Sequence, residues 1–135
     1  MTLPFVGTWK LVSQHMLFPD GKRELARGEN PDGILMYDTA GNMSVQLMRT
    51  DERAAEFSDM LNLEQALQGF LSYYGRYEVD EAAGIVRHLV TGSSCFAYRN
   101  TTQVRRYQFA GDTLTLKAQS PIDESTRLLV WQRIG

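Results

Sequence analysis

Turn-forming residues recur along this chain at spacings too short for helical crossovers between strands. Gly, Asn, Asp and Pro gather near residues 19–21, 30–33, 39–41, 81–84 and 110–112, and each supplies a positive φ or a side chain that bonds its own backbone. Strand-length segments rich in β-branched and aromatic residues lie between them, which predicts an antiparallel meander. The predicted strands are 7–16, 22–26, 33–37, 43–48, 73–79, 85–92, 102–109, 113–118 and 126–133. So many strands must close or fold over to hide their edges, so we expect an all-β, closed antiparallel barrel of about eight to nine strands.

One region, residues 51–71, departs from the two-residue period of a strand. Its apolar residues fall at helical spacing, and these are Phe57, Met60, Leu61, Leu67, Phe70 and Leu71. Thr50 precedes two acids and is the predicted N-cap. Asn62, with Gln65 three residues later, has the pattern of a second cap. We expect a short helical insertion here, either one kinked helix or two short ones, packed over one end of the barrel.

Composition restricts the class of protein. A chain of 135 residues with 43% hydrophobic content fits a single domain, residues 1–135. Its net charge of −2 argues against nucleic acid as a partner and against a polybasic membrane patch. Cys95, the one cysteine, has no partner for a disulfide. No apolar run reaches the ~18 residues of a membrane span, and Met1 to Val6 lacks the pattern of a signal peptide. We therefore expect a cytoplasmic protein.

Alternation along the predicted strands places several polar side chains on the inward face. An unpaired buried polar group costs about 1–3 kcal/mol, so inward polar residues predict a wet cavity rather than a uniformly apolar core. The first predicted strand directs Ser13 and His15 inward together with Trp9 and Leu11. The other predicted inward sets are Tyr73, Gly75, Tyr77 and Val79; Val86, His88 and Val90; Gln103, Arg105, Tyr107 and Phe109; Leu114, Leu116 and Ala118; and Leu129, Trp131 and Arg133.

The first and last predicted strands carry a family resemblance. Gly7 and Trp9 form a Gly-x-Trp motif that resembles the first strand of the calycin superfamily, in which an arginine of the last strand, here Arg133, packs on that tryptophan. Segments 32–37, 41–49, 73–80, 102–107 and 111–116 resemble, in this order, a family of small single-domain lipocalin-like proteins. The resemblance implies a closed antiparallel barrel with a helical insertion midway. Fatty-acid-binding proteins carry a helical lid where this chain has the turn at 19–21, so ligand identities are not transferred.

His88 and Arg105 are the main candidates for chemistry. His88 lies between Val86 and Val90 on an inward face, where its imidazole either anchors a ligand, transfers a proton, or simply satisfies a core hydrogen bond. Arg105 and Tyr107 point the same way and together suit a carboxylate. There are two alternatives for Arg105: it neutralises an internal acid, or Arg106 faces inward in its place.

Further polar side chains extend this predicted ligand site. Tyr73, Tyr77, Gln103 and Ser13 add hydroxyl and amide groups, although the tyrosines also serve as packing residues. No Ser-His-Asp set is evident, and His15 with His88 lacks a third metal ligand. Glycine-rich phosphate loops are absent from the sequence. We therefore expect neither a metal nor another cofactor.

Three functions agree with these observations. The first is a barrel that binds a small, mostly apolar molecule, either acidic or carbonyl-bearing, with His88, Arg105 and Tyr107 as its polar contacts. The second is a cofactor-independent isomerase, cyclase or dehydratase acting on a polyketide- or terpenoid-like substrate, with His88 as the base. The third is an interaction module whose barrel is filled by side chains. A homodimer formed through a strand edge or the helical face is left open.

Overall fold

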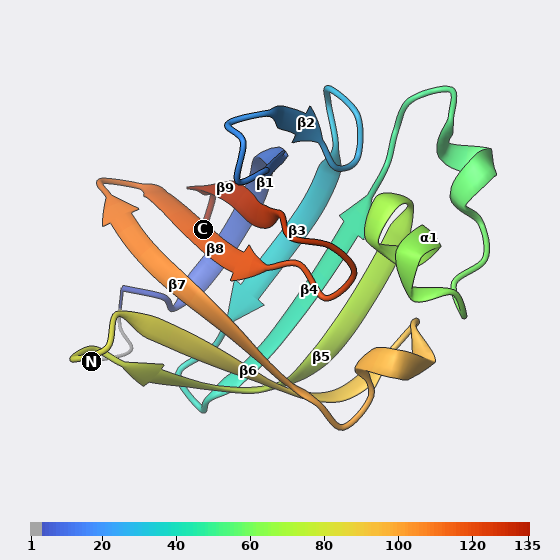
Figure 1. Ribbon diagram of the computed structural model, residues 1–135. Helices are drawn as coiled ribbons and strands as arrows, with labels where there is room; N and C mark the ends of the chain where they lie inside the picture. Colours follow the sequence, from blue (N-terminus) through green and yellow to red (C-terminus); the bar gives the residue numbers. More distant parts are fainter. Residues whose placement is uncertain (1–3) are drawn as a thin grey trace.

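The computed structural model describes residues 4–135; the first three residues of the expected domain lie outside the described residues. Eight antiparallel strands close into a barrel (Figure 1), because β1 pairs with β3 through its first half and with β9 along most of its length. A ninth strand, β2 (Arg23–Leu25), pairs only with the second half of β1. The barrel strands are β1 (Gly7–Leu17), β3 (Asp32–Tyr37), β4 (Asn42–Met48), β5 (Phe70–Asp80), β6 (Ile85–Ser93), β7 (Thr102–Ala110), β8 (Thr113–Gln119) and β9 (Thr126–Arg133). The predicted all-β barrel is confirmed.

Trp9 and Arg133 close one end of the barrel. The Trp9 side chain is fully buried, and the guanidinium carbon of Arg133 lies 4.3 Å from the centre of a Trp9 ring. Arg133 also donates hydrogen bonds to the carbonyls of Val6 (2.8 Å) and Pro4 (2.6 Å). A Cβ at Gly7 would lie 2.6 Å from an Arg133 nitrogen, so this close approach requires glycine. The cation–π contact and the hydrogen bonds fasten both ends of the described chain to the same end of the barrel.

Aromatic side chains fill the barrel interior next to this end. The Phe5 ring centre lies 4.9 Å from those of Tyr107 and Phe109. Tyr37 packs against Tyr77 with 4.7 Å between ring centres. These edge-to-face contacts leave the free interior space to the opposite half of the barrel.

The helical insertion covers the opposite end as two short helices, η1 (Ala54–Phe57) and α1 (Leu63–Gln68). Asn62 caps α1 as predicted, since its side chain accepts a hydrogen bond from the Gln65 backbone N–H at 3.2 Å. The predicted cap at Thr50 is wrong, because the Thr50 hydroxyl instead donates to the Asn30 carbonyl. The predicted helical region also extended too far, because α1 ends at Gln68 with Gly69 as its C-cap, and Phe70 and Leu71 begin β5.

A β-bulge in β1 changes which side chains face the interior. Leu11 pairs with Trp131, but Ser13 pairs with Val130, so Val12 is an extra residue in the ladder. Beyond the bulge the alternation is reversed. Gln14 is therefore buried inside the barrel, while Ser13 is only half-buried. The expectation that Ser13 faces the interior is wrong for this reason.

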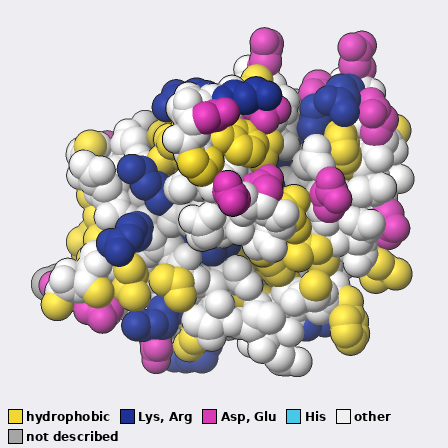
Figure 2. Space-filling model, in the orientation of Figure 1, with side chains coloured by type: hydrophobic (Ala, Val, Ile, Leu, Met, Phe, Trp, Pro, Cys, Tyr) yellow, Lys and Arg dark blue, Asp and Glu magenta, His cyan; other side chains and the backbone are white. Residues whose placement is uncertain are grey.

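The surface carries mixed charge. Figure 2 shows basic and acidic side chains interspersed over one face, with hydrophobic side chains between them. In the described part of the chain, no helix is both long enough and apolar enough to cross a membrane.

Candidate functional site

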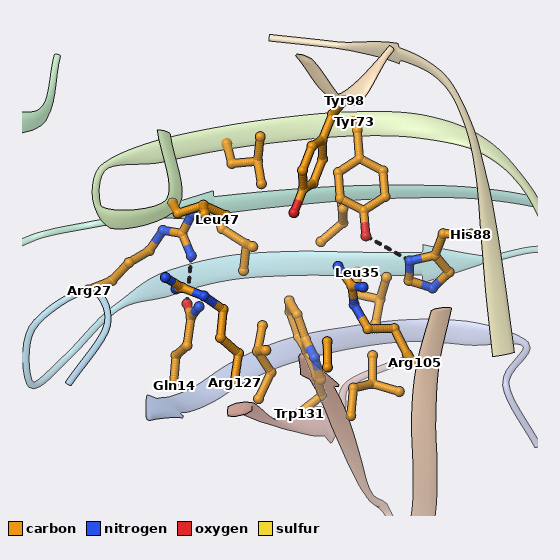
Figure 3. Close-up of a pocket in the computed structure, with 16 residues that line it drawn as sticks. Gln14, Arg27, Leu35, Leu47, Tyr73, His88, Tyr98, Arg105, Arg127 and Trp131 are labelled. Atoms are coloured by element: carbon orange, nitrogen blue, oxygen red, sulfur yellow. Dashed lines mark hydrogen bonds between the residues drawn. The ribbon is translucent and has the colours of Figure 1, made fainter. Parts of the chain in front are cut away.

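A cavity of about 40 Å³ lies inside the barrel, and Figure 3 shows the side chains that line it. This volume is far below the roughly 300–1,000 Å³ of a typical ligand pocket, so a ligand of more than a few atoms must displace lining side chains. Its apolar lining residues are Leu35, Val45, Leu47, Leu67, Leu71, Leu116, Ala118, Leu129 and Trp131, and its polar ones are Gln14, Arg27, Tyr73, His88, Tyr98, Arg105 and Arg127.

Three of the lining residues are arginines and none is acidic. Arg27 and Arg127 are almost fully buried, with 1% and 5% of their surfaces exposed, and Arg105 is half-buried. Removing a cation from water is costly unless an anion or several hydrogen bonds compensate. The cavity therefore has an excess of positive charge.

Arg27 is compensated by hydrogen bonds. It lies between β2 and β3, and its guanidinium donates to the carbonyls of Gly69 (3.0 Å) and Ala66 (2.8 Å) and to the side-chain oxygen of Gln14 (2.6 Å). Burial, followed by the nearby charge of Arg127, lowers the pKa of Arg27 to about 9. Arg27 therefore stays largely protonated at neutral pH and ties α1 to the barrel.

Arg127, on β9, lacks such compensation. None of its three guanidinium nitrogens has a hydrogen-bond partner in the described chain. Burial is also the main cause that lowers its pKa. The carboxylate of Asp123 acts on Arg127 only through its charge, since it accepts hydrogen bonds from the backbone and hydroxyl of Ser125 and does not line the cavity. The Arg127 charge is thus buried without a bonded acceptor.

The unpaired polar atoms of the cavity are all donors. Within residues 4–135, the buried side-chain nitrogens or oxygens without a partner belong to Arg127 and to the indole N–H of Trp131. Both residues line the cavity. Buried donors in folded proteins are nearly always paired, so the group that suits this cavity is one that accepts hydrogen bonds.

His88 lies between two tyrosines. The Tyr37 hydroxyl is 2.6 Å from His88 Nε2, and the Tyr73 hydroxyl is 2.7 Å from Nδ1. Burial, followed by the charge of Arg105, lowers the pKa of His88 to about 3. Burial raises the pKa of Tyr73 to about 12 and that of Tyr37 well above its usual value. At neutral pH all three side chains are therefore uncharged.

The structure brings together three of the predicted site residues, His88, Arg105 and Tyr73, around the cavity. Tyr77 and Tyr107 belong to the filled aromatic end, where the Tyr77 hydroxyl donates to the Asp38 carbonyl at 2.8 Å. The alternation of side chains predicted that both tyrosines face the interior, but it does not indicate how far the cavity extends along each strand.

The remaining predicted residues lie outside the cavity. Gln103 is half-buried, and its side-chain amide donates to the Thr101 hydroxyl at 2.9 Å. Ser13 is displaced by the bulge. In the described chain no three His, Cys, Asp or Glu side chains gather where they could hold a metal ion.

Sequence reasoning missed Arg127, Arg27, Gln14 and Tyr98. A signal for Arg127 existed, because it precedes Leu129 and Trp131 by even steps on the same strand face. Gln14 was hidden by the bulge. Arg27 lies in a loop and Tyr98 ends the short helix η2 (Phe96–Tyr98), where no strand period indicates direction.

Two solved structures are similar to this chain at low sequence identity. A redesigned β-barrel matches 99% of this chain and 95% of its own length, with 13% sequence identity and a TM-score of 0.49. A point mutant of the fluorescent protein UnaG matches 98% of both chains, with 11% identity and a TM-score of 0.46. A comparison with curated proteins finds no significant match.

The family comparison covers nearly the whole sequence. The model of the lipocalin-like domain matches residues 6–134. This span runs from the segment before β1 to the end of β9, and so includes the Trp9–Arg133 closure and all lining residues of the cavity. The chain therefore belongs to the lipocalin-like domain family.

Proposed function

We propose that this protein binds a small, mostly apolar molecule that carries an anionic group, most simply a carboxylate, inside its barrel. The observation that carries the proposal is Arg127, a residue that is 5% exposed, lines a cavity without an acid, and has no hydrogen-bond partner for its guanidinium in the described chain. A carboxylate supplies both the missing charge and two acceptor oxygens in the geometry that a guanidinium fork suits.

The rest of the cavity suits an apolar body. Leucines contributed by β3, β4, β5, β8, β9 and α1 are six of its nine apolar lining residues. A few polar groups set in an apolar wall are the usual make-up of a small-molecule site. Because the free volume is about 40 Å³, we expect binding to push α1 or its neighbouring side chains outward.

The alternative functions have less support. An isomerase, cyclase or dehydratase with His88 as its base requires a ring nitrogen that takes up a proton near neutral pH. The pKa of His88 is about 3, and tyrosine hydroxyls hold both of its nitrogens. A barrel filled by side chains fits the aromatic end, but it does not account for the unpaired donors of Arg127 and Trp131.

Straight-chain carboxylates from acetate to octanoate test the proposal. We expect affinity to rise about fourfold per methylene, as burial of about 0.8 kcal/mol per CH₂ implies, until the apolar wall is covered. The primary alcohol of equal length should bind at least about tenfold more weakly, because a hydrogen bond to a charged group is worth about 1.5–3 kcal/mol. Calorimetry measures these affinities. Tryptophan fluorescence reports ligand binding in the cavity, since Trp131 lines it.

Two arginine variants make the test specific. Arg127→Met should remove the preference for carboxylate over alcohol. Arg106→Met, an exposed arginine on β7, is the matched control and should keep it. Equal affinity for acids and alcohols, equal effects of the two substitutions, or no binding by any chain length would contradict the proposal.

A further inference from the structure

The hydrogen bonds of His88 determine where the Tyr73 hydroxyl proton points. A neutral imidazole has one N–H donor and one acceptor nitrogen. Since both nitrogens of His88 contact tyrosine hydroxyls, one tyrosine must donate to the ring and the other must accept from it. The surroundings of the two hydroxyls decide between the two arrangements.

Tyr37 is the donor. It is 2% exposed, is packed between Phe5 and Tyr77, and does not line the cavity. Its hydrogen-bond partner in the described chain is His88 Nε2. If Tyr37 accepted from that nitrogen, its own O–H would be buried without an acceptor, which is disfavoured. Tyr37 therefore donates a hydrogen bond to His88 Nε2. The His88 ring proton lies on Nδ1, and this N–H donates a hydrogen bond to the Tyr73 oxygen.

Tyr73 differs from Tyr37 because it lines the cavity (Figure 3). Its oxygen accepts from His88 Nδ1, and the nearby charge of Arg105 acts on the same hydroxyl. Because its oxygen accepts from the ring, the Tyr73 O–H is left to donate to a group inside the cavity.

We propose that the Tyr73 hydroxyl donates a hydrogen bond to a carbonyl oxygen of the ligand, so that the ligand is an oxo acid. The carboxylate half of this assignment rests on the function proposed above. The carbonyl half rests on Tyr73, Arg105 and the unpaired indole N–H of Trp131, which present only donors to the cavity. A ligand hydroxyl would add another donor to that wall, whereas a carbonyl oxygen only accepts. Tyr37 and His88 are positioning residues, because they act through Tyr73.

The first test needs no ligand. Nitrogen-15 NMR at neutral pH distinguishes the protonated from the unprotonated nitrogen of each histidine, and His15→Gln assigns the signals because the chain has two histidines. We expect the His88 proton on Nδ1. A proton on Nε2 would mean that Tyr73 donates to the ring, and would overturn the inference whatever the protein binds.

The second test compares hexanoate with its 3-, 4- and 5-oxo derivatives. At least one oxo acid should bind about fivefold to tenfold more tightly than hexanoate, the range expected for one hydrogen bond. Tyr73→Phe should bring that ratio to one, and Tyr37→Phe should reduce it. Tyr74→Phe, on the exposed face of the same strand, should preserve it.

The outcomes separate the two proposals. If hexanoate binds but no oxo acid is preferred, or if the preference survives in Tyr73→Phe, the carbonyl assignment is wrong and the carboxylate site stands. If neither hexanoate nor any oxo acid binds, the proposed function fails and the oxo-acid assignment fails with it. The histidine tautomer is measured on a chain in which Tyr73 is intact, so poor folding of Tyr73→Phe does not affect that test.

Discussion

Arg127→Met is expected to raise the free energy of unfolding of the ligand-free protein by about 1–3 kcal/mol, the gain seen when buried charges are replaced by apolar side chains of similar size. Arg127 bears a buried charge and no hydrogen bond in the described chain, so the substitution removes a desolvation cost and no bonded contact. Methionine is unbranched and fills irregular gaps well. Urea unfolding at pH 7 measures the change.

Arg27→Met is the matched comparison and should have the opposite sign. Arg27 donates to Gly69, Ala66 and Gln14, and its loss leaves the buried acceptors of Ala66 and Gln14 without this donor, whereas the Gly69 carbonyl keeps the Arg49 backbone N–H at 3.1 Å. We expect the free energy of unfolding to fall by about 2–4 kcal/mol, since each unsatisfied buried group costs about 1–3 kcal/mol and water reaches some of them. If both substitutions lower the free energy of unfolding by the same amount, Arg127 stabilises the fold and is not a residue kept for ligand binding.

Acidification is expected to destabilise the protein through His88, beginning well above the range in which carboxylates titrate. The pKa of His88 is about 3 in the folded state and about 6.5 when unfolded. Between these values the unfolded chain binds a proton that the folded chain does not, so stability is complete above pH 6.5 and falls as the pH is lowered toward 3. The slope within this window approaches about 1.4 kcal/mol per pH unit.

Urea unfolding at pH 7.0, 6.0, 5.0 and 4.5 tests this expectation. The aspartates with lowered pKa values titrate below this range, and they are Asp32, Asp38, Asp51 and Asp123. His88→Gln should flatten the pH dependence, while also lowering stability at pH 7 because Tyr37 and Tyr73 lose their partner. His15→Gln should keep the wild-type slope. A slope that survives in His88→Gln would place the titrating group elsewhere.

The barrel was largely predictable because its signals are local. Turn residues at short spacing located the strands, and the Gly7, Trp9 and Arg133 motif indicated how the barrel closes. The main error concerned β1, where one extra residue at Val12 exchanged Ser13 for Gln14 in the interior. A bulge depends on how β9 pairs with β1, and this long-range pairing leaves no mark in the two-residue period.

The candidate site was predictable in part for the same reason. His88, Arg105 and Tyr73 lie on regular strands, where alternation assigns the face. Arg27 and Tyr98 reach the cavity from a loop and a short helix, and their positions depend on tertiary contacts alone. Alternation also placed Tyr77 and Tyr107 inside without indicating that Phe5 packs against them and fills that half of the barrel.

The central claim is that the barrel holds a buried positive charge at Arg127 that an anionic ligand compensates. The most direct measurement is the free energy of unfolding against octanoate concentration, with chloride exchanged for octanoate so that ionic strength stays constant. Above its dissociation constant, octanoate should stabilise the wild type by about 1.4 kcal/mol for each tenfold increase in concentration, and in Arg127→Met the same rise should begin only at a concentration at least about tenfold higher. Equal stabilisation of both proteins, or none of either, would contradict the claim.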